Sequence, residues 1–159
     1  MSKTNLDRMM QMVSDFFDVQ NDPQQLQVDE TIISTLIALH PASVSELDYG
    51  DGPVAWILLI PTTIDVMHSF LNNTCNEQDL LNNTSIDSNF NALYLCSAIV
   101  LPEYQQQGIA RQLTLKAIEE IQKTYAIEYL FYWPFSAGGI KLAESIAKSK
   151  KLKLYKRQK

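Results

Sequence analysis

The chain has 159 residues, of which 46% are hydrophobic and 19% are charged, and its formal net charge is −5. This composition predicts one globular domain, residues 1–159, and excludes disordered and collagen-like chains. The charge is unevenly placed, because residues 141–159 carry eight basic residues and one acid. A strand with a solvated face explains this basic tail better than a nucleic-acid surface, so we expect no nucleic-acid partner.

Signals for export, membrane insertion and metal binding are missing from the sequence. No apolar run approaches the roughly 18 residues of a membrane span. The first residues, MSKTNLDRMMQMVSDFF, carry charges where a signal peptide would be apolar. Two cysteines, Cys75 and Cys96, are too few for a disulfide framework, and no Cys or His pair has metal-site spacing. We therefore expect a cytoplasmic protein without a membrane partner or a metal.

The N-terminal half predicts helices and one hairpin. Apolar residues at helical spacing predict helices over 5–18 and 28–39. Their inward positions would be Leu6, Met9, Met10, Val13, Phe16 and Phe17 in the first helix and Ile32, Ile33, Leu36 and Ile37 in the second. A turn through Asp51-Gly52 predicts a β-hairpin of residues 43–48 and 54–60, which Pro61 would end. Helical patterns follow at 63–71, with His68 on the apolar face, and more weakly at 77–81.

The C-terminal half predicts alternating strands and helices. The nearly continuous apolar run at 92–100 is typical of a strand buried on both faces, and Pro102 would end it. A helix over 109–125 and a strand over 129–135 follow, so these two strands should be parallel and joined by a right-handed crossover. Ser136 could cap a further helix to about residue 148. Residues 151–156 alternate like a half-buried strand.

The turn between the first of these strands and its helix is the segment most suited to binding. A helix start presents backbone N–H groups with no intrahelical partner, and the helix dipole adds partial positive charge. Phosphate groups bind at such places. Gly108 permits close backbone approach or an unusual dihedral angle, and Ala110 leaves room beside the first helical turn. Taken alone, these features also fit an ordinary loop.

The full turn resembles a known signature. Gln105, Gly108 and Ala110 fit the pattern Gln/Arg-x-x-Gly-x-Gly/Ala, and the approach to it contains Val100, Pro102, Glu103 and Tyr104. On these residues the segment 92–135 resembles the GNAT superfamily of N-acetyltransferases. The resemblance implies an α/β (α+β) fold with a GNAT-type mixed, mostly antiparallel sheet, helices on both faces and a splayed parallel strand pair.

The resemblance also implies acetyl-CoA, or another acyl-CoA, as co-substrate. Backbone amides of residues 106–111 would hold its pyrophosphate, and its pantetheine arm would lie along residues 98–100. The cofactor-binding residues implied are Ala98, Ile99, Val100, Gln105, Gln106, Gln107, Gly108, Ile109, Ala110 and Arg111. Arg111 could contact a phosphate or could be a simple exposed helix residue.

The implied activity is transfer of the acyl group to a primary amine, on a small molecule or a peptide, by direct attack. Two departures from the family pattern leave the catalytic residues open. The strand at 92–100 offers Tyr94, Cys96 and Ser97 where many relatives have an acid, and Leu142-Ala143 stands where a Leu-Tyr pair is usual. The substitutes available are Tyr132, Tyr155 and His68, with Asp65 and Glu46 behind them. Each tyrosine also fits a core or rim position, and His68 a packed one.

Departures from the family pattern also suggest another function and another form of the sheet. A non-catalytic acyl-CoA binding or sensing module would need neither a strand acid nor a helix tyrosine. The strand that usually opens the GNAT sheet is not evident before the first helix. The sheet is therefore expected to be trimmed, or to be completed by a second subunit in a homodimer.

Overall fold

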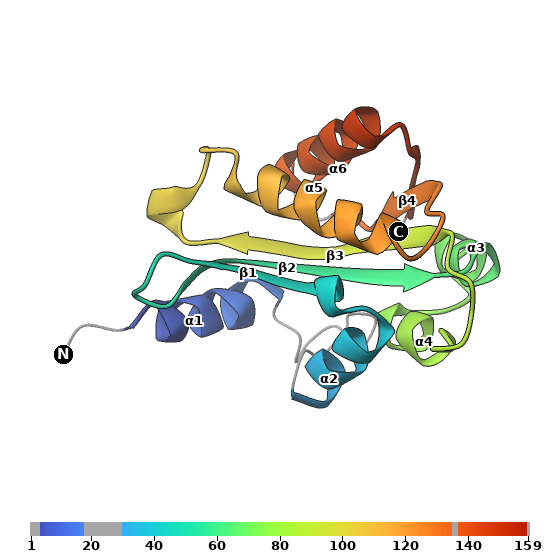
Figure 1. Cartoon of the computed structure of the whole chain (residues 1–159), viewed down its shortest axis with the longest axis horizontal. Coiled ribbons are helices and arrows are strands. Elements are labelled where there is room, and N and C mark those ends of the chain that lie inside the picture. The colour runs from blue at the N-terminus through green and yellow to red at the C-terminus, as the bar shows by residue number, and fades with distance from the viewer. Residues whose placement is uncertain (1–3, 18–29, 135–136, 159) are drawn as a thin grey trace.

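The apolar runs of the sequence form one sheet in the order β1-β2-β3-β4-β5 (Figure 1). The computed structural model describes residues 4–17, 30–134 and 137–158, without the side chains of residues 14–17. The strands are β1 (Val44–Asp48), β2 (Pro53–Thr62), β3 (Ala92–Val100), β4 (Tyr129–Tyr132) and β5 (Lys153–Lys156). The pairs β1/β2 and β2/β3 are antiparallel, and the pairs β3/β4 and β4/β5 are parallel. The sheet is thus mixed, and its two C-terminal pairs are parallel because both connections there are helical crossovers.

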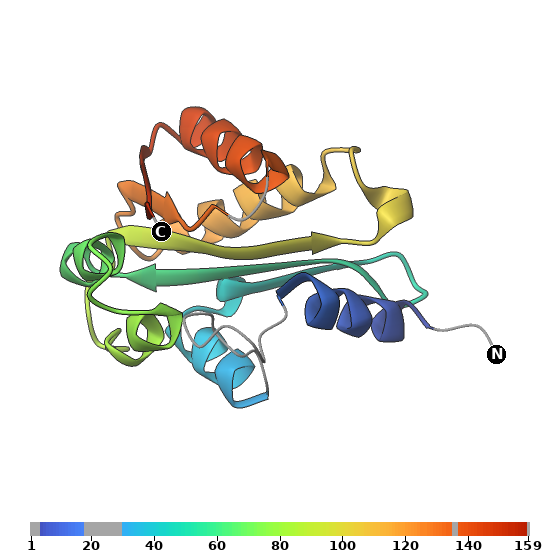
Figure 2. The same cartoon turned by 180° about the vertical axis from the view of Figure 1, so that it is seen from behind.

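Helices cover both faces of this sheet. The α-helices are α1 (Asn5–Phe17), α2 (Glu30–Leu39), α3 (Ile64–Leu71), α4 (Glu77–Asn82), α5 (Ile109–Gln122) and α6 (Ala137–Lys150). Two short 3-10 helices are η1 (Pro41–Ser43) and η2 (Pro102–Tyr104). Figures 1 and 2 show α5 and α6 on one face and α1, α2 and α4 on the other. The expected α+β class with helices on both faces is therefore confirmed.

Hydrogen bonds from capping residues explain where α3 and α4 begin. The Thr63 hydroxyl accepts a hydrogen bond from the N–H of Val66 and caps α3. In α4, the side chains of Asn76 and Asp79 each accept from the other's backbone N–H, which is a capping box. Both helices begin where the sequence predicts them.

The first helix buries a narrower stripe than expected. Met9 is fully buried, and Met12 and Val13 pack partly against the core, whereas Leu6 and Met10 are about half exposed, 49% and 56%. The prediction that Leu6 and Met10 point inward was wrong, because α1 meets the sheet along one line only. The side chains of Phe16 and Phe17 lie outside the described residues.

The second helix also buries a narrower stripe of residues than expected. Ile32, Leu36 and Leu39 are buried, but Ile37, predicted to face inward, is 47% exposed. A stripe at positions i, i+4 and i+7 is enough to cover this end of β1 and β2.

Pro61 does not end its strand, contrary to the prediction. It lies inside β2 and pairs with Leu93 of β3. The pairing of β1 with β2 stops at Val44 opposite Leu58, so β2 has a described neighbour on one side only at Pro61. A proline is tolerated at such an edge position because its missing N–H costs no ladder bond.

The C-terminal elements shift by a few residues from their predicted bounds. The helix ends at Gln122 and not at residue 125, and β4 ends at Tyr132 and not at residue 135. The parallel pairing of β3 and β4 across a helix is confirmed. The proposed Ser136 cap lies outside the described residues. In β5, Leu154 is half-buried while its two neighbours, Lys153 and Tyr155, are exposed, as the alternation predicts, but Lys156 is exposed as well.

A small apolar cluster supports the turn between β3 and α5. It joins Met9 of α1 to Ile99 and Val100 of β3 and to Ile109 at the start of α5. The guanidinium of Arg8 also donates two hydrogen bonds to the Glu103 carboxylate, at 2.6 and 2.7 Å. The first helix therefore holds the turn in place from below.

Candidate functional site

The strands β3 and β4 pair along less than half of β3. Their last partners are Leu95 and Tyr132. From Ser97 to Val100, β3 pairs with β2 alone among the described strands. The two parallel strands therefore diverge beyond Leu95 and Tyr132, and we call this opening the fork.

A β-bulge marks the start of this fork. In the pairing of β2 with β3, Leu58 lies opposite Ser97 and Leu59 lies opposite Leu95. Cys96 is the extra residue between them. A bulge bends and twists its strand locally, which is how β3 turns away from β4.

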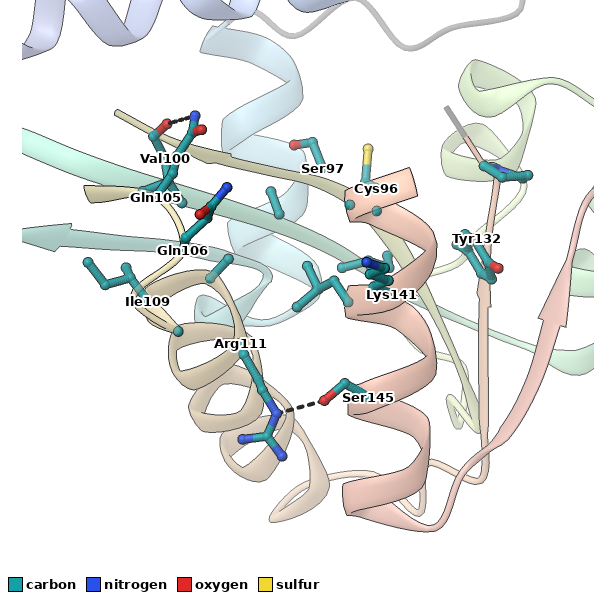
Figure 3. A pocket seen from close by; sticks show the side chains of 18 of the residues that line it. Cys96, Ser97, Val100, Gln105, Gln106, Ile109, Arg111, Tyr132, Lys141 and Ser145 are labelled. Carbon is teal, nitrogen blue, oxygen red and sulfur yellow. Dashed lines mark hydrogen bonds between the residues drawn. The ribbon is translucent and has the colours of Figure 1, made fainter. Parts of the chain in front are cut away.

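The fork opens into a cavity of about 580 Å³. Its inner end is lined mostly by apolar or aromatic side chains, namely Leu95, Cys96, Tyr132, Trp133 and Leu142. Its mouth contains Gln105, Gln106 and Gly108. Lys141 of α6 lies nearer Cys96 and Tyr132, and Arg111 and Ser145 line the cavity where α5 meets α6 (Figure 3). Figure 3 shows Gln105, Gln106 and Ile109 gathered at one end of the cavity and Tyr132 at the other. The site is thus elongated, with a polar entrance and an apolar end.

The turn at the mouth has an unusual backbone. Gly108 has φ 77° and Gln106 has φ 63°, both in the left-handed region. A Cβ atom placed on Gly108 would meet no heavy atom within 4 Å, so this residue faces open space. The side-chain amide of Gln105 donates to the carbonyl of Val100 at 2.9 Å and ties the turn to the end of β3.

The first turn of α5 leaves backbone donors for a ligand. Its first helical hydrogen bond runs from the N–H of Gln112 to the carbonyl of Gly108, at 2.9 Å. The N–H groups of Ile109, Ala110 and Arg111 lie before that bond and have no intrahelical acceptor. These donors lie at the cavity mouth, beside the positive end of the α5 dipole. The arrangement suits an elongated ligand with an anionic end.

Arg111 has a structural role that the sequence did not reveal. Its Nε donates to the hydroxyl of Ser145 at 2.7 Å, and a second nitrogen donates to Ser149. Both serines lie on α6, so Arg111 fixes α5 against α6 along the lower wall of the cavity (Figure 3). Arg111 is exposed, as one of the two sequence-based alternatives expects, but its guanidinium is hydrogen-bonded to α6.

Two titratable groups lie at the inner end. Burial, with a smaller contribution from the charge of Glu144, raises the pKa of the Tyr132 phenol above its usual value. Burial and the charge of Glu77 raise the pKa of the Cys96 thiol well above its usual range. Both groups therefore stay protonated at neutral pH. Tyr132 can donate a proton, whereas Cys96 is a poor nucleophile.

The structure separates the sequence-predicted catalytic candidates. Tyr132 lines the cavity. Tyr155 is 41% exposed on β5, packs near Tyr129 and is not part of the cavity lining. His68 is exposed on α3, contrary to the packed position predicted for it. Glu46 and Asp65 are likewise exposed and outside the lining, and Glu46 accepts from the Trp56 indole at 2.7 Å.

Most of the residues implied for the cofactor do surround the cavity. The lining includes Ala98, Val100, Gln105, Gln106, Gly108, Ile109, Ala110 and Arg111. Ile99 instead packs into the cluster beneath the turn. Gln107 is exposed, and its side chain donates to the carbonyl of Glu103 at 3.1 Å.

Sequence reasoning missed a buried polar group behind the fork. Glu77 of α4 is 3% exposed, and its carboxylate accepts the hydroxyl hydrogen of the fully buried Tyr94 of β3. Arg157 is also 3% exposed. An acid at a helix start and an arginine in a basic tail both looked like surface residues, so no sequence signal indicated their burial.

Comparisons with known proteins add no family to these observations. A scan against models of known protein families and a search of curated proteins find no match. None of the described helices is long and apolar enough to cross a membrane. Within the described ranges, no three His, Cys, Asp or Glu side chains gather as a metal site would need.

Proposed function

We propose that this chain is an acyltransferase of the GNAT type, which moves an acetyl or other acyl group from acyl-CoA to a primary amine. The observation that carries the proposal is the continuity of one cavity. It runs from the free amides at the Gly108 turn, along the unpaired edge of β3, to Tyr132 at the apex of the fork. The GNAT assignment of the fold and the cytoplasmic location belong to the same proposal.

The residues present fit a CoA derivative. The N–H groups of Ile109, Ala110 and Arg111 would hold the diphosphate, as helix starts do. The edge of β3 from Ser97 to Val100 would pair with the two amides of the pantetheine arm, in the manner of an added strand. The open space at Gly108 allows the diphosphate to approach the backbone.

The reaction is attack of a neutral amine nitrogen on the thioester carbonyl, which forms a C–N bond and breaks the C–S bond. The leaving thiolate then takes up a proton. Tyr132 is our candidate for this general acid, because its phenol lies at the apex of the fork and keeps its proton at neutral pH. No described residue of the lining is acidic, so the amine would lose its proton to water.

A second function, a non-catalytic acyl-CoA binding or sensing module, is favoured by two observations. The described lining holds no carboxylate, and Ala143, which stands where the family tyrosine is usual, is fully buried. Such a module would bind the co-substrate tightly without turnover.

The deciding experiment has two steps. Calorimetric titration of the whole chain with CoA and acetyl-CoA should show binding with one site per chain. A screen of amines, polyamines, amino acids and peptides with acetyl-CoA, read by release of free thiol, should then show turnover. Binding without turnover for any acceptor would favour the sensing module. Absence of binding would overturn both functions.

A further inference from the structure

A tryptophan lines the cavity next to Tyr132, at the inner end. This residue, Trp133, follows directly after β4 and is half-buried. Leu95 and Cys96 lie across the fork from it on β3. The cavity therefore ends in apolar and aromatic surface, whereas its mouth is polar.

The ring of Trp133 is held by stacking. The guanidinium carbon of Arg157 lies 4.5 Å from the centroid of the Trp133 ring and 4.5 Å from that of Phe70. The two rings also meet edge to face, with centroids 6.1 Å apart and an interplanar angle of 80°. Phe70 is fully buried in α3, so it provides a fixed support for the other two groups.

Arg157 is fixed in turn by contacts to separate elements. Its Nε donates to the side-chain oxygen of Asn73, just after α3, at 2.6 Å. Its backbone N–H donates to the carbonyl of Tyr132 at 2.9 Å and so extends the pairing of β4 and β5. Movement of Trp133 away from the cavity would disturb α3, β4 and the end of β5 together. These contacts hold Trp133 against three elements.

The direction in which the cavity runs determines which part of a bound ligand would contact Trp133. From Val100 back to Cys96 there are four residue-to-residue steps of strand, about 13 Å. With the diphosphate at the Gly108 turn and the arm along β3, the thioester would lie near the bulge at Cys96. The acyl group beyond it would point towards Trp133.

We propose that Trp133, positioned by Arg157, limits the co-substrate to short acyl groups such as acetyl and propionyl. This inference rests on the proposed acyl-CoA function and adds the acyl class to it. A tryptophan held in this way excludes longer chains because they would need it to move. Such steric selection is typically worth about tenfold or more for each added methylene that finds no room.

The test is calorimetry with CoA, acetyl-CoA and hexanoyl-CoA, which needs no knowledge of the acceptor. Wild-type protein should bind hexanoyl-CoA at least about tenfold more weakly than acetyl-CoA. Trp133→Ala should remove or reverse this preference while affinity for CoA itself stays unchanged. Tyr155→Ala is the matched control, because it removes an aromatic side chain of the neighbouring strand β5 that does not line the cavity.

Two further variants keep the proposal testable if Trp133→Ala fails to fold. Trp133→Phe should relax the selection partly, since a smaller ring leaves some room. Arg157→Met should relax it through the loosened tryptophan, with no direct contact to the ligand. Equal binding of acetyl-CoA and hexanoyl-CoA by the wild type would overturn the inference, as would an unchanged preference in Trp133→Phe. Failure of the wild type to bind CoA would overturn the proposed function and this inference with it.

Discussion

The two halves of β3 come from one apolar run but have different surroundings. Residues Ala92–Leu95 are paired on both sides and buried, and Tyr94 there donates to the buried Glu77. Residues 97–100 keep β2 as a neighbour but face a cavity on the other side. The length of β4, only four residues, decides which half becomes core and which becomes cavity wall. A binding site can therefore arise from a missing strand neighbour, without any change in the composition of the strand itself.

The largest effect is expected at the mouth of the cavity, beside the half of β3 that lacks β4 as a neighbour. Gly108→Trp should lower the affinity for CoA by about 1,000-fold, because its bulk would fill the diphosphate turn and block several charge-assisted hydrogen bonds. The matched control is Gly108→Ala, which carries the same backbone cost of about 1 kcal/mol at φ 77° but little bulk. Calorimetry should show a loss for tryptophan only. Retained affinity in Gly108→Trp would contradict the placement of the diphosphate.

The next effect concerns the apex of the fork. Tyr132→Phe should reduce turnover by about 100-fold, because the leaving thiolate loses its proton donor. The dissociation constant for acetyl-CoA should stay unchanged, since the ring is kept. The measurement is thiol release with an acceptor found in the amine screen, at saturating acetyl-CoA. Unchanged turnover would remove Tyr132 from the mechanism and leave the proton to water.

A substitution in Ala92–Leu95, the half of β3 that is paired on both sides, should change the stability of the fold and not the binding of CoA. Tyr94→Phe leaves the buried Glu77 carboxylate without one donor, which should lower the free energy of unfolding by about 2 kcal/mol. Tyr132→Phe is the matched control, because it removes the hydroxyl of a buried tyrosine of β4 that lines the cavity. Urea unfolding of the two variants should therefore separate a tyrosine of the paired core from one at the cavity. An equal loss in both would show that the distinction between these two positions has no energetic basis.

The smallest effect lies where α1 supports the turn. Hydrogen bonds from Arg8 lower the pKa of the exposed Glu103 to about 2. Because the folded-state pKa is depressed, this contact stabilises the fold above the ordinary value of 4.5 and is lost as the pH falls from there towards 2. Melting temperatures of the wild type and Glu103→Gln should differ slightly at pH 7 and converge near pH 2. A constant difference across this range would mean that the ion pair is not its cause.

Local patterns were sufficient to predict most elements. The hairpin around Gly50 and Gly52, the helix after Thr63 and the buried strand ending before Pro102 all depend on residues close together in the chain. The predictions were wrong where contact with a segment far away in the chain decides whether a residue is exposed or where a strand ends. Leu6 and Met10 are exposed because α1 touches the sheet along one line, and Pro61 continues its strand because β1 stops short of it.

For the site, the sequence determined the turn: Gln105, Gly108 and Ala110 could be recognised as a group, and the structure places all three at one cavity mouth. The tertiary structure alone decided that Tyr132, and not Tyr155 or His68, reaches the cavity, and that Arg157 stacks on Trp133 at its inner end. The physical reason is that hydrophobic periodicity reports the surroundings of one segment. The fork depends instead on the register and relative length of two strands that α5 separates in the chain.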